Sequence, residues 1–261
     1  MKPVLIQFYG FEIYSYGLML AIAFLTGIFG VRFLIRQKGL DVSFDAVVDL
    51  AVWVLVGAIV GARLAYIITD FRYFLIFPGE IFKINSGGLA FHGGLIGGFG
   101  AGYWFTRVKR IPTWQLADLV APMIAFGYAL VRVGCLLNGC CYGKTSALPW
   151  ALRCASNDSL LRHPTQLYSL IGSLILAVIL FKLRNHKQFP GFLFLLYIGL
   201  YSILRFGVEF FREGPMIFPW LSLAQGVCLL LGILAFTLIW WQRARFKKGR
   251  MNQDAVSEIH R

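Results

Sequence analysis

Charged residues are scarce in this sequence. Only 14% of its 261 residues are Asp, Glu, Lys or Arg, and 58% are hydrophobic, whereas an average soluble domain carries about 25% charged residues. Apolar runs of about 20 residues recur, each long enough to cross a bilayer. They are continuous rather than alternating, which argues against a β-barrel. We therefore expect an all-α, polytopic integral membrane protein.

Three other features are missing. No small-residue cleavage site follows the first apolar run, so we expect that run to remain as a membrane span. No long internal repeat is present, which counts against a transporter built from two matching halves. The five cysteines form neither an even-numbered disulfide framework nor a paired zinc-binding pattern, so no metal is expected. A disulfide to Cys154 on the outer face stays open, and Cys228 is interpreted as a core residue.

Seven stretches are predicted to cross the membrane: Ile13–Leu34, Ala46–Ile68, Leu89–Phe105, Leu116–Leu137, Leu167–Leu183, Gly191–Phe211 and Leu221–Trp241. The third is rich in glycine, a poor helix former in water. Its pairs Gly93/Gly97, Gly94/Gly98 and Gly98/Gly102 instead follow the small-xxx-small pattern, which lets membrane helices approach closely. We predict one transmembrane domain over residues 1–248 and a disordered cytoplasmic tail over residues 249–261.

Basic residues are concentrated in alternate connections. The richer set is Arg32, Arg36, Lys38, Arg107, Lys109, Arg110, Lys182, Arg184, Lys187, Arg243, Arg245, Lys247, Lys248 and Arg250. The poorer set, half as large, is Lys2, Arg72, Lys83, Lys144, Arg153, Arg162 and Arg212. Because cytoplasmic connections carry the excess of Lys and Arg, we predict an N-terminus outside and a cytoplasmic C-terminus. This topology also accounts for the net charge of +13 without a nucleic-acid partner.

The two longest connections, Thr69–Gly88 and Asn138–Thr165, are both predicted on the outer side. Long loops in compact proteins are often functional. The apolar residues of Tyr73–Phe77 and Ile81–Phe82 predict a segment that lies on the bilayer surface.

The sixth predicted span carries charge at membrane depth, where a central arginine costs at least a few kcal/mol. The stripe Tyr197, Tyr201, Arg205, Glu209 and Glu213 has a spacing of four and so shares one helix face. Either Arg205 and Glu209 form a structural ion pair, or Glu209 orients a charged Arg205 toward a phosphate.

Four other segments carry candidate site residues. Arg132 lies inside the fourth span near its outer end, ahead of Asn138, Gly139 and Gly143. These glycines permit close approach to a ligand, although a helix end with a glycine turn gives the same pattern. Histidine is the side chain best suited to exchange a proton at physiological pH, so His92 is either a proton acceptor or a hydrogen-bonded structural residue.

His163 and Gln166 precede the fifth span, where an ordinary proline turn is the alternative, and Arg63 lies near the outer end of the second span. In the seven-span topology, five of these residues fall in the outer half of the membrane: Arg63, His92, Arg132, Arg205 and Glu209. This grouping predicts a phosphate site with a nearby base.

Six motifs occur in order along the chain: Tyr16–Met19, Gly61–Tyr66, Gly87–Ile96, Arg132–Gly143, Arg162–Tyr168 and Tyr201–Arg212. With them the sequence resembles the bacterial prolipoprotein diacylglyceryl transferases. The resemblance implies an enzyme of the bacterial plasma (inner) membrane, active toward its outer face and without a cofactor. Such an enzyme moves the diacylglyceryl group of phosphatidylglycerol onto the lipobox cysteine of a prolipoprotein signal peptide and releases glycerol phosphate.

The motifs and the resemblance together predict two groups of site residues. The catalytic candidates are His92, Arg132, Arg205 and Glu209. The substrate-binding candidates are Tyr16, Arg63, Asn138, Gly139, Gly143, His163, Gln166 and Tyr201. On this hypothesis the arginines Arg132 and Arg205 hold the phosphate, and His92 either accepts the thiol proton or positions the lipid.

The chain departs from the family pattern near Arg132. Cys135 and Cys140 stand where the family usually has an asparagine and an acidic residue, and Lys144 stands where arginine is common. This leaves open a divergent paralogue that acts on another lipid or thiol. The sequence is also compatible with a transporter or flippase for an anionic lipid or solute, and with a thiol-redox protein built on Cys140 and Cys141.

Overall fold

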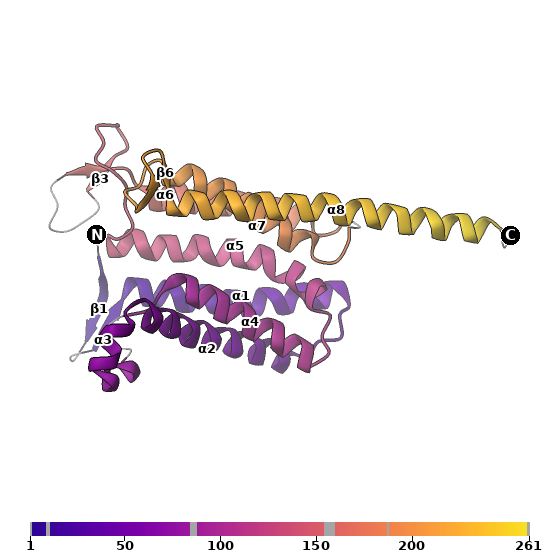
Figure 1. The fold of residues 1–261 in the computed structure, drawn as a ribbon, viewed down its shortest axis with the longest axis horizontal. Helices are drawn as coiled ribbons and strands as arrows, with labels where there is room; N and C mark the ends of the chain where they lie inside the picture. Colours follow the sequence, from indigo (N-terminus) through magenta and orange to yellow (C-terminus); the bar gives the residue numbers. More distant parts are fainter. Residues whose placement is uncertain (1, 9–10, 84–87, 154–159, 187, 260–261) are drawn as a thin grey trace. The chain divides into compact units, whose positions relative to one another are not determined.

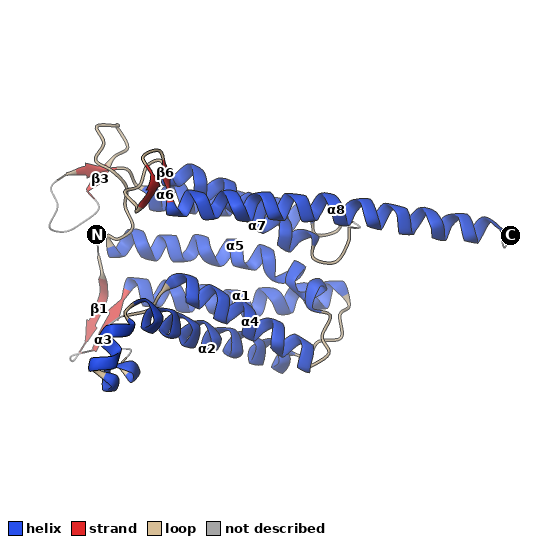
Figure 2. Cartoon of the chain, in the orientation of Figure 1, coloured by secondary structure: helices blue, strands red, loops and turns tan. Residues whose placement is uncertain are grey.

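The computed structural model describes residues 2–8, 11–83, 88–153, 160–186 and 188–259, apart from the side chains of residues 8, 11 and 247–259. Its helices are α1 (Ser15–Lys38), α2 (Phe44–Thr69), α3 (Phe71–Ile76), α4 (Phe91–Val108), α5 (Thr113–Asn138), α6 (Thr165–Leu183), α7 (Phe192–Glu209), α8 (Leu223–Ile259) and the 3₁₀ helix η1 (Pro78–Phe82) (Figure 1). The described residues also form three short antiparallel strand pairs (Figure 2). They are β1 (Val4–Phe8) with β2 (Phe11–Tyr14) before α1, β3 (Leu152–Arg153) with β4 (Leu161–Arg162) between α5 and α6, and β5 (Met216–Phe218) with β6 (Leu221–Ser222) between α7 and α8.

Within the described residues, six helices are long and apolar enough to cross a membrane: α1, α2, α5, α6, α7 and residues 223–246 of α8. This confirms a mostly helical, polytopic membrane protein. Helix α4 forms where the third span is predicted, but it is absent from this set because glycines and its polar ends lower its hydropathy. The count of seven crossings and the orientation of the termini stay predictions.

The first predicted span begins two residues too early. Ile13 and Tyr14 belong to β2, where Ile13 pairs with Ile6 of β1. Helix α1 starts at Ser15, whose backbone N–H and side-chain hydroxyl both donate to the Pro3 carbonyl. The hairpin therefore satisfies the polar groups at the start of α1.

The chain packs as two compact units, Met1–Gly30 with Ala117–Arg261, and Val31–Leu116. In the second unit α2 and α4 run antiparallel, since Gly61 faces Gly93 while Gly57 faces Ala101. The two backbones touch: a Cβ on Gly97 would lie 2.9 Å from the Gly61 Cα. The close approach predicted from the small-xxx-small pairs is therefore confirmed.

Adding one methyl group at this contact is expected to destabilise the second unit. A Gly97→Ala substitution should cost about 1–3 kcal/mol, because the new methyl must push two backbones apart. Gly100→Ala is the matched control on the same helix, since nothing lies within 4 Å of a Cβ at that position. Thermal unfolding in detergent should separate the two variants, and equal midpoints would contradict the backbone contact.

In the first unit α5 and α7 run parallel, and hydrogen bonds link the two helices near their starts and just beyond their ends. Near their starts the Asp118 carboxylate accepts hydrogen bonds from the backbone N–H groups of Gly191 (2.8 Å) and Phe194 (3.1 Å). Beyond their ends the Lys144 N–H donates to the Phe211 carbonyl (2.8 Å). Helices α6 and α8 pack on α7, around a core that includes Leu180 and Leu193.

Two surface segments bear on the sequence predictions. Helices α3 and η1 occupy the segment predicted on the bilayer surface, and they expose large apolar side chains such as Ile76 and Phe82. Helix α8 continues to Ile259 through the segment for which a disordered tail is predicted, and its side chains beyond Phe246 lie outside the description.

Candidate active site

Two tyrosines join α5 and α7 beside the predicted arginines. The rings of Tyr128 and Tyr201 meet edge to face, with their centroids 5.3 Å apart. Arg132 follows Tyr128 by four residues, and Arg205 follows Tyr201 by four. Because α5 and α7 are parallel, both arginines branch from their helices one turn beyond the tyrosine of the same helix, in the same direction. The structure therefore brings Arg132 and Arg205 to one end of the first unit, as the sequence predicts.

Arg132 has few partners for its five N–H donors. Its guanidinium lies 4.5 Å from the centroid of the Tyr128 ring, and Nη2 donates to the Tyr128 hydroxyl. Nη1 lies 3.9 Å from the Cys135 sulfur, a weak acceptor. Buried Nε has no hydrogen-bond partner among the described residues. A partly buried guanidinium with donors to spare is suited to an anionic group.

Arg205 is paired with Glu209. Its Nη1 lies 2.6 Å from Glu209 Oε2, and Nε of Arg212 lies 3.8 Å from the same oxygen. The contact between Arg205 Nη1 and Glu209 Oε2 is therefore an ion pair without hydrogen-bond geometry, because Oε2 has no partner at hydrogen-bonding angles among the described residues. The Ser222 hydroxyl donates to Oε1 (3.4 Å). Glu209 is 5% exposed, whereas the Arg205 side chain is 23% exposed and can still reach a ligand.

Helix α5 ends in a Schellman motif. The Gly139 N–H donates to the Leu136 carbonyl and the Cys140 N–H to the Cys135 carbonyl, with Gly139 at φ 70°. The predicted glycine turn is therefore present at Gly139, and Asn138 is exposed beside it. Tyr16 approaches the same end of α5, since a Cβ on Gly134 would lie 3.3 Å from the Tyr16 Cα.

The segment after this turn is held from two sides. The Cys141 carbonyl accepts from the Thr165 hydroxyl and from Arg212 Nη1, both at 2.8 Å. The fully buried Gln166 donates from Nε2 to the Cys140 carbonyl (2.6 Å), and its Oε1 has no partner among the described residues. Gly143 lies against the Phe211 carbonyl, where a side chain would not fit.

Three thiols meet in this segment. Cys135, Cys140 and Cys141 are free, and their sulfur atoms all lie within 4.8 Å of one another. A hydrogen bond from the Cys135 thiol lowers the pKa of Cys141 to about 5, whereas burial raises the pKa of Cys140. Cys228 is also a free thiol, and Cys154 lies outside the described residues.

His163 lies next to this segment. Its Nδ1 is 3.2 Å from the Tyr168 hydroxyl, and that hydroxyl accepts a hydrogen bond from Trp150 Nε1 (2.9 Å). Its ring centroid is 4.9 Å from that of Phe211. His163 is thus fixed by aromatic neighbours.

Arg63 and His92 belong to the second unit. Arg63 donates to the backbone carbonyls of Ile81 (3.0 Å), Lys83 (3.0 Å), Gly88 (2.9 Å) and Glu80. These bonds engage its N–H donors and fix the segment that contains η1. His92 is exposed in the first turn of α4, with its ring 5.7 Å from that of Phe91.

Sequence reasoning missed two neighbours of the predicted catalytic residues. Tyr128 supports Arg132, and its Tyr-x-x-x-Arg spacing repeats that of Tyr201 and Arg205, so the repeated spacing was a usable signal. The contact between Ser222 and Glu209 joins different elements, and no local pattern indicates it.

The fold and these contacts define a polytopic membrane protein with two arginines at one end of a helix bundle. A family model described as prolipoprotein diacylglyceryl transferase matches residues 3–241. The chain belongs to this family.

Relatives named phosphatidylglycerol–prolipoprotein diacylglyceryl transferase support the assignment. The protein from Geobacter sulfurreducens is 36% identical over 213 residues, which cover 81% of this chain and 82% of the relative. The protein from Clostridium tetani is 33% identical over 246 residues, covering 91% of this chain and 98% of the relative. The resemblance seen in the motifs is therefore confirmed over most of the chain.

Proposed function

We propose that this protein transfers the diacylglyceryl group of phosphatidylglycerol to the lipobox cysteine thiol of a prolipoprotein, the first step of lipoprotein maturation. The family and the names of its relatives supply the substrates. The assignment of the site depends on one observation: Arg132 and Arg205 lie on parallel helices, and the buried Nε of Arg132 has no hydrogen-bond partner among the described residues. The family match favours a transferase over a transporter.

In the proposed reaction the thiolate sulfur attacks the glycerol carbon that carries the phosphate. A carbon–sulfur bond forms, the carbon–oxygen bond to phosphate breaks, and glycerol phosphate leaves with the electron pair. Arg132 and Arg205 hold the phosphate and stabilise the negative charge that develops on it. Glu209 keeps Arg205 oriented. His92 accepts the thiol proton or positions the lipid.

The remaining predicted residues receive supporting roles. Tyr16, Asn138 and Tyr201 bind substrate near the two arginines. His163, Gln166, Gly139 and Gly143 shape the segment that follows α5. Arg63 acts through the outer segment that it fixes, because its observed hydrogen bonds go to backbone carbonyls.

We also propose that α4 is a seventh crossing and that the site faces outward in the bacterial inner membrane. Antiparallel packing on the apolar helix α2 supports membrane depth for α4. With seven crossings the connections rich in Lys and Arg all fall on one side, which is cytoplasmic by the positive-inside rule.

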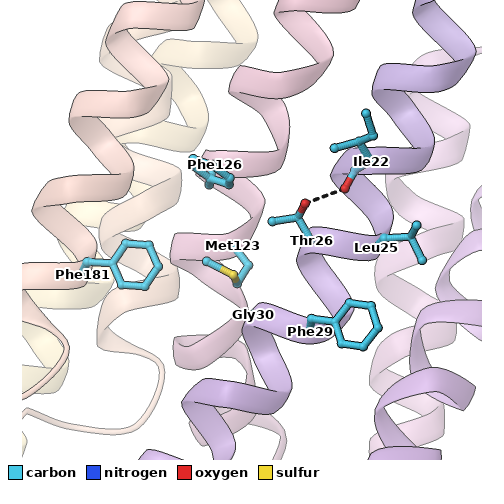
Figure 3. A pocket seen from close by; sticks show the side chains of 8 residues that line it. All are labelled: Ile22, Leu25, Thr26, Phe29, Gly30, Met123, Phe126 and Phe181. Atoms are coloured by element: carbon cyan, nitrogen blue, oxygen red, sulfur yellow. Dashed lines mark hydrogen bonds between the residues drawn. The ribbon is translucent and has the colours of Figure 1, made fainter.

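An apolar hollow of about 510 Å³ lies in the first unit, lined by Leu25, Phe29, Met123, Phe126, Phe181 and their neighbours (Figure 3). Thr26 donates to the Ile22 carbonyl of its own helix (2.6 Å), which leaves the hollow apolar. Met123 precedes Arg132 by nine residues, or about 14 Å of helix. A lipid held by its phosphate at Arg132 can therefore extend an acyl chain into the hollow.

Filling this hollow should distinguish long lipids from short ones. Thr26→Trp is expected to raise the KM for phosphatidylglycerol with 16- to 18-carbon chains by about tenfold, the equivalent of 1.4 kcal/mol, and to change the KM for six-carbon chains little. Thr26→Val keeps the volume and serves as the control. Equal effects on both lipids would contradict an acyl-chain site.

The proposed activity is tested directly with purified full-length protein, phosphatidylglycerol and a peptide that contains a lipobox cysteine. Mass spectrometry should show a diacylglyceryl adduct on the cysteine and release of glycerol phosphate. A peptide with serine in place of that cysteine is the control. A modified serine peptide, or no adduct on the cysteine peptide, would refute the proposal.

A further inference from the structure

The three thiols at the end of α5 have no part in the proposed transfer. Cys135 lies in the last turn of the helix, and the Schellman turn brings Cys140 and Cys141 back toward it. All three sulfur atoms lie within 4.8 Å of one another. Three side chains from one short segment therefore converge on a single point.

The backbone of this segment is held in the converging arrangement. Cys141 has φ 63°, in the left-handed region that residues other than glycine seldom adopt. Such a conformation persists only where the surroundings impose it. Here Thr165 and Arg212 both hold the Cys141 carbonyl, and Gln166 holds that of Cys140. The thiols thus start close to one another without a disulfide.

The distances between the three sulfur atoms suit a bound metal ion. A metal–sulfur bond of about 2.3 Å places three sulfurs around one ion at about 4 Å from one another. The observed separations reach no more than 4.8 Å, so a closure of less than about 1 Å would complete the site.

The three sulfur donors indicate which kind of metal ion would bind. Sulfur ligands favour soft or borderline cations such as Cu⁺ and Zn²⁺. Structural zinc sites use four protein ligands, whereas the group within the described residues consists of three cysteines and no histidine or carboxylate. We propose that Cys135, Cys140 and Cys141 bind one soft cation through three sulfur atoms, and that monovalent copper fits them best. Binding displaces the remaining thiol protons to solvent, so that all three sulfur atoms bind as thiolates, and leaves the oxidation state of the ion unchanged.

The site lies close enough to Arg132 to affect it. Nη1 of Arg132 is already 3.9 Å from the Cys135 sulfur. Three thiolates and one monovalent cation carry a net charge of −2, which would draw the guanidinium toward the sulfur atoms and away from a phosphate. Copper should therefore inhibit the transfer reaction, a consequence that rests on the proposed function, whereas binding itself does not.

Binding is tested on detergent-purified full-length protein under anaerobic conditions, with monovalent copper supplied from a chromogenic chelator. We expect one tightly held copper per chain, with sulfur as the ligand in X-ray absorption. Cys135→Ser, Cys140→Ser and Cys141→Ser should each weaken retention at least tenfold, whereas Cys228→Ser should retain copper like the wild type. No retention by the wild type, or undiminished retention by all three single variants, would overturn the proposal. Tighter binding of zinc in a four-coordinate site would also overturn it.

A second experiment uses only the wild-type protein, so its result does not depend on whether the cysteine variants fold. Copper should protect Cys135, Cys140 and Cys141 of the wild type from alkylation, as followed by mass spectrometry of the peptides. Labelling of Cys228 in the unfolded protein should be the same with and without prior copper. Unprotected cluster thiols would refute the site even if transfer proceeds. If copper is bound but no transfer occurs without copper, the site stands and the proposed function fails.

Discussion

Replacing Arg132 by Ala is expected to reduce the rate of diacylglyceryl transfer by about 10²- to 10³-fold, the usual loss when one donor to a developing negative charge is removed. Arg132 is partly buried, and its Nε has no partner among the described residues, so its donors are available to a phosphate. The loss should appear mainly in kcat, because charge on the leaving phosphate grows toward the transition state. Initial rates with phosphatidylglycerol and a lipobox peptide measure it.

Lysine at position 132 should restore little of the rate. Its ammonium keeps the charge but cannot offer the paired donors of a guanidinium. Arg243→Lys is the matched control, since Arg243 lies over the Phe192 ring at the start of α7. Elution volume and thermal midpoint in detergent should stay those of the wild type in all variants. Transfer within threefold of the wild type in a folded Arg132→Ala protein would exclude the phosphate role.

Much of the fold follows from local composition. Long apolar runs predict the spanning helices, and regular glycines predict the contact between α2 and α4. The hairpin β1–β2 was missed because the predicted span includes Ile13 and Tyr14, which directly precede the apolar helix α1. What makes them a strand is pairing with Val4–Phe8, and no periodicity in Phe11–Tyr14 reveals that pairing.

The candidate site was predictable where its residues share a helix. Arg205 and Glu209 lie four residues apart, and the ion pair follows from that spacing. The thiol group was not predictable, because the sequence places Cys135 five residues before Cys140 without a known ligand pattern. The Schellman turn, which reverses the chain at Gly139, brings the sulfur atoms together.

Replacing Glu209 by Gln should lower both stability and activity. Glu209 is the counter-charge of Arg205 at 2.6 Å and of Arg212 at 3.8 Å. Loss of one member of a buried pair costs about 3–5 kcal/mol; because Arg205 is 23% exposed, we expect about 2–3 kcal/mol. A displaced Arg205 should also slow transfer by about 10²-fold. The predicted stripe is wrong for Glu213, because α7 ends at Glu209 and Glu213 lies exposed beyond the helix. Glu213→Gln therefore makes the same change outside the ion pair and should leave both quantities unaltered.

The double variant Arg205→Met with Glu209→Leu separates a structural ion pair from a functional one. Apolar residues of similar volume often restore the stability lost when a buried pair is broken, so the thermal midpoint should return toward that of the wild type. Transfer should remain as slow as in Arg205→Met alone, because no guanidinium is left on α7 to hold the phosphate. Recovery of transfer together with stability would show that Arg205 and Glu209 serve only the packing of the first unit. In that case Arg132 would be the principal phosphate ligand of this unit.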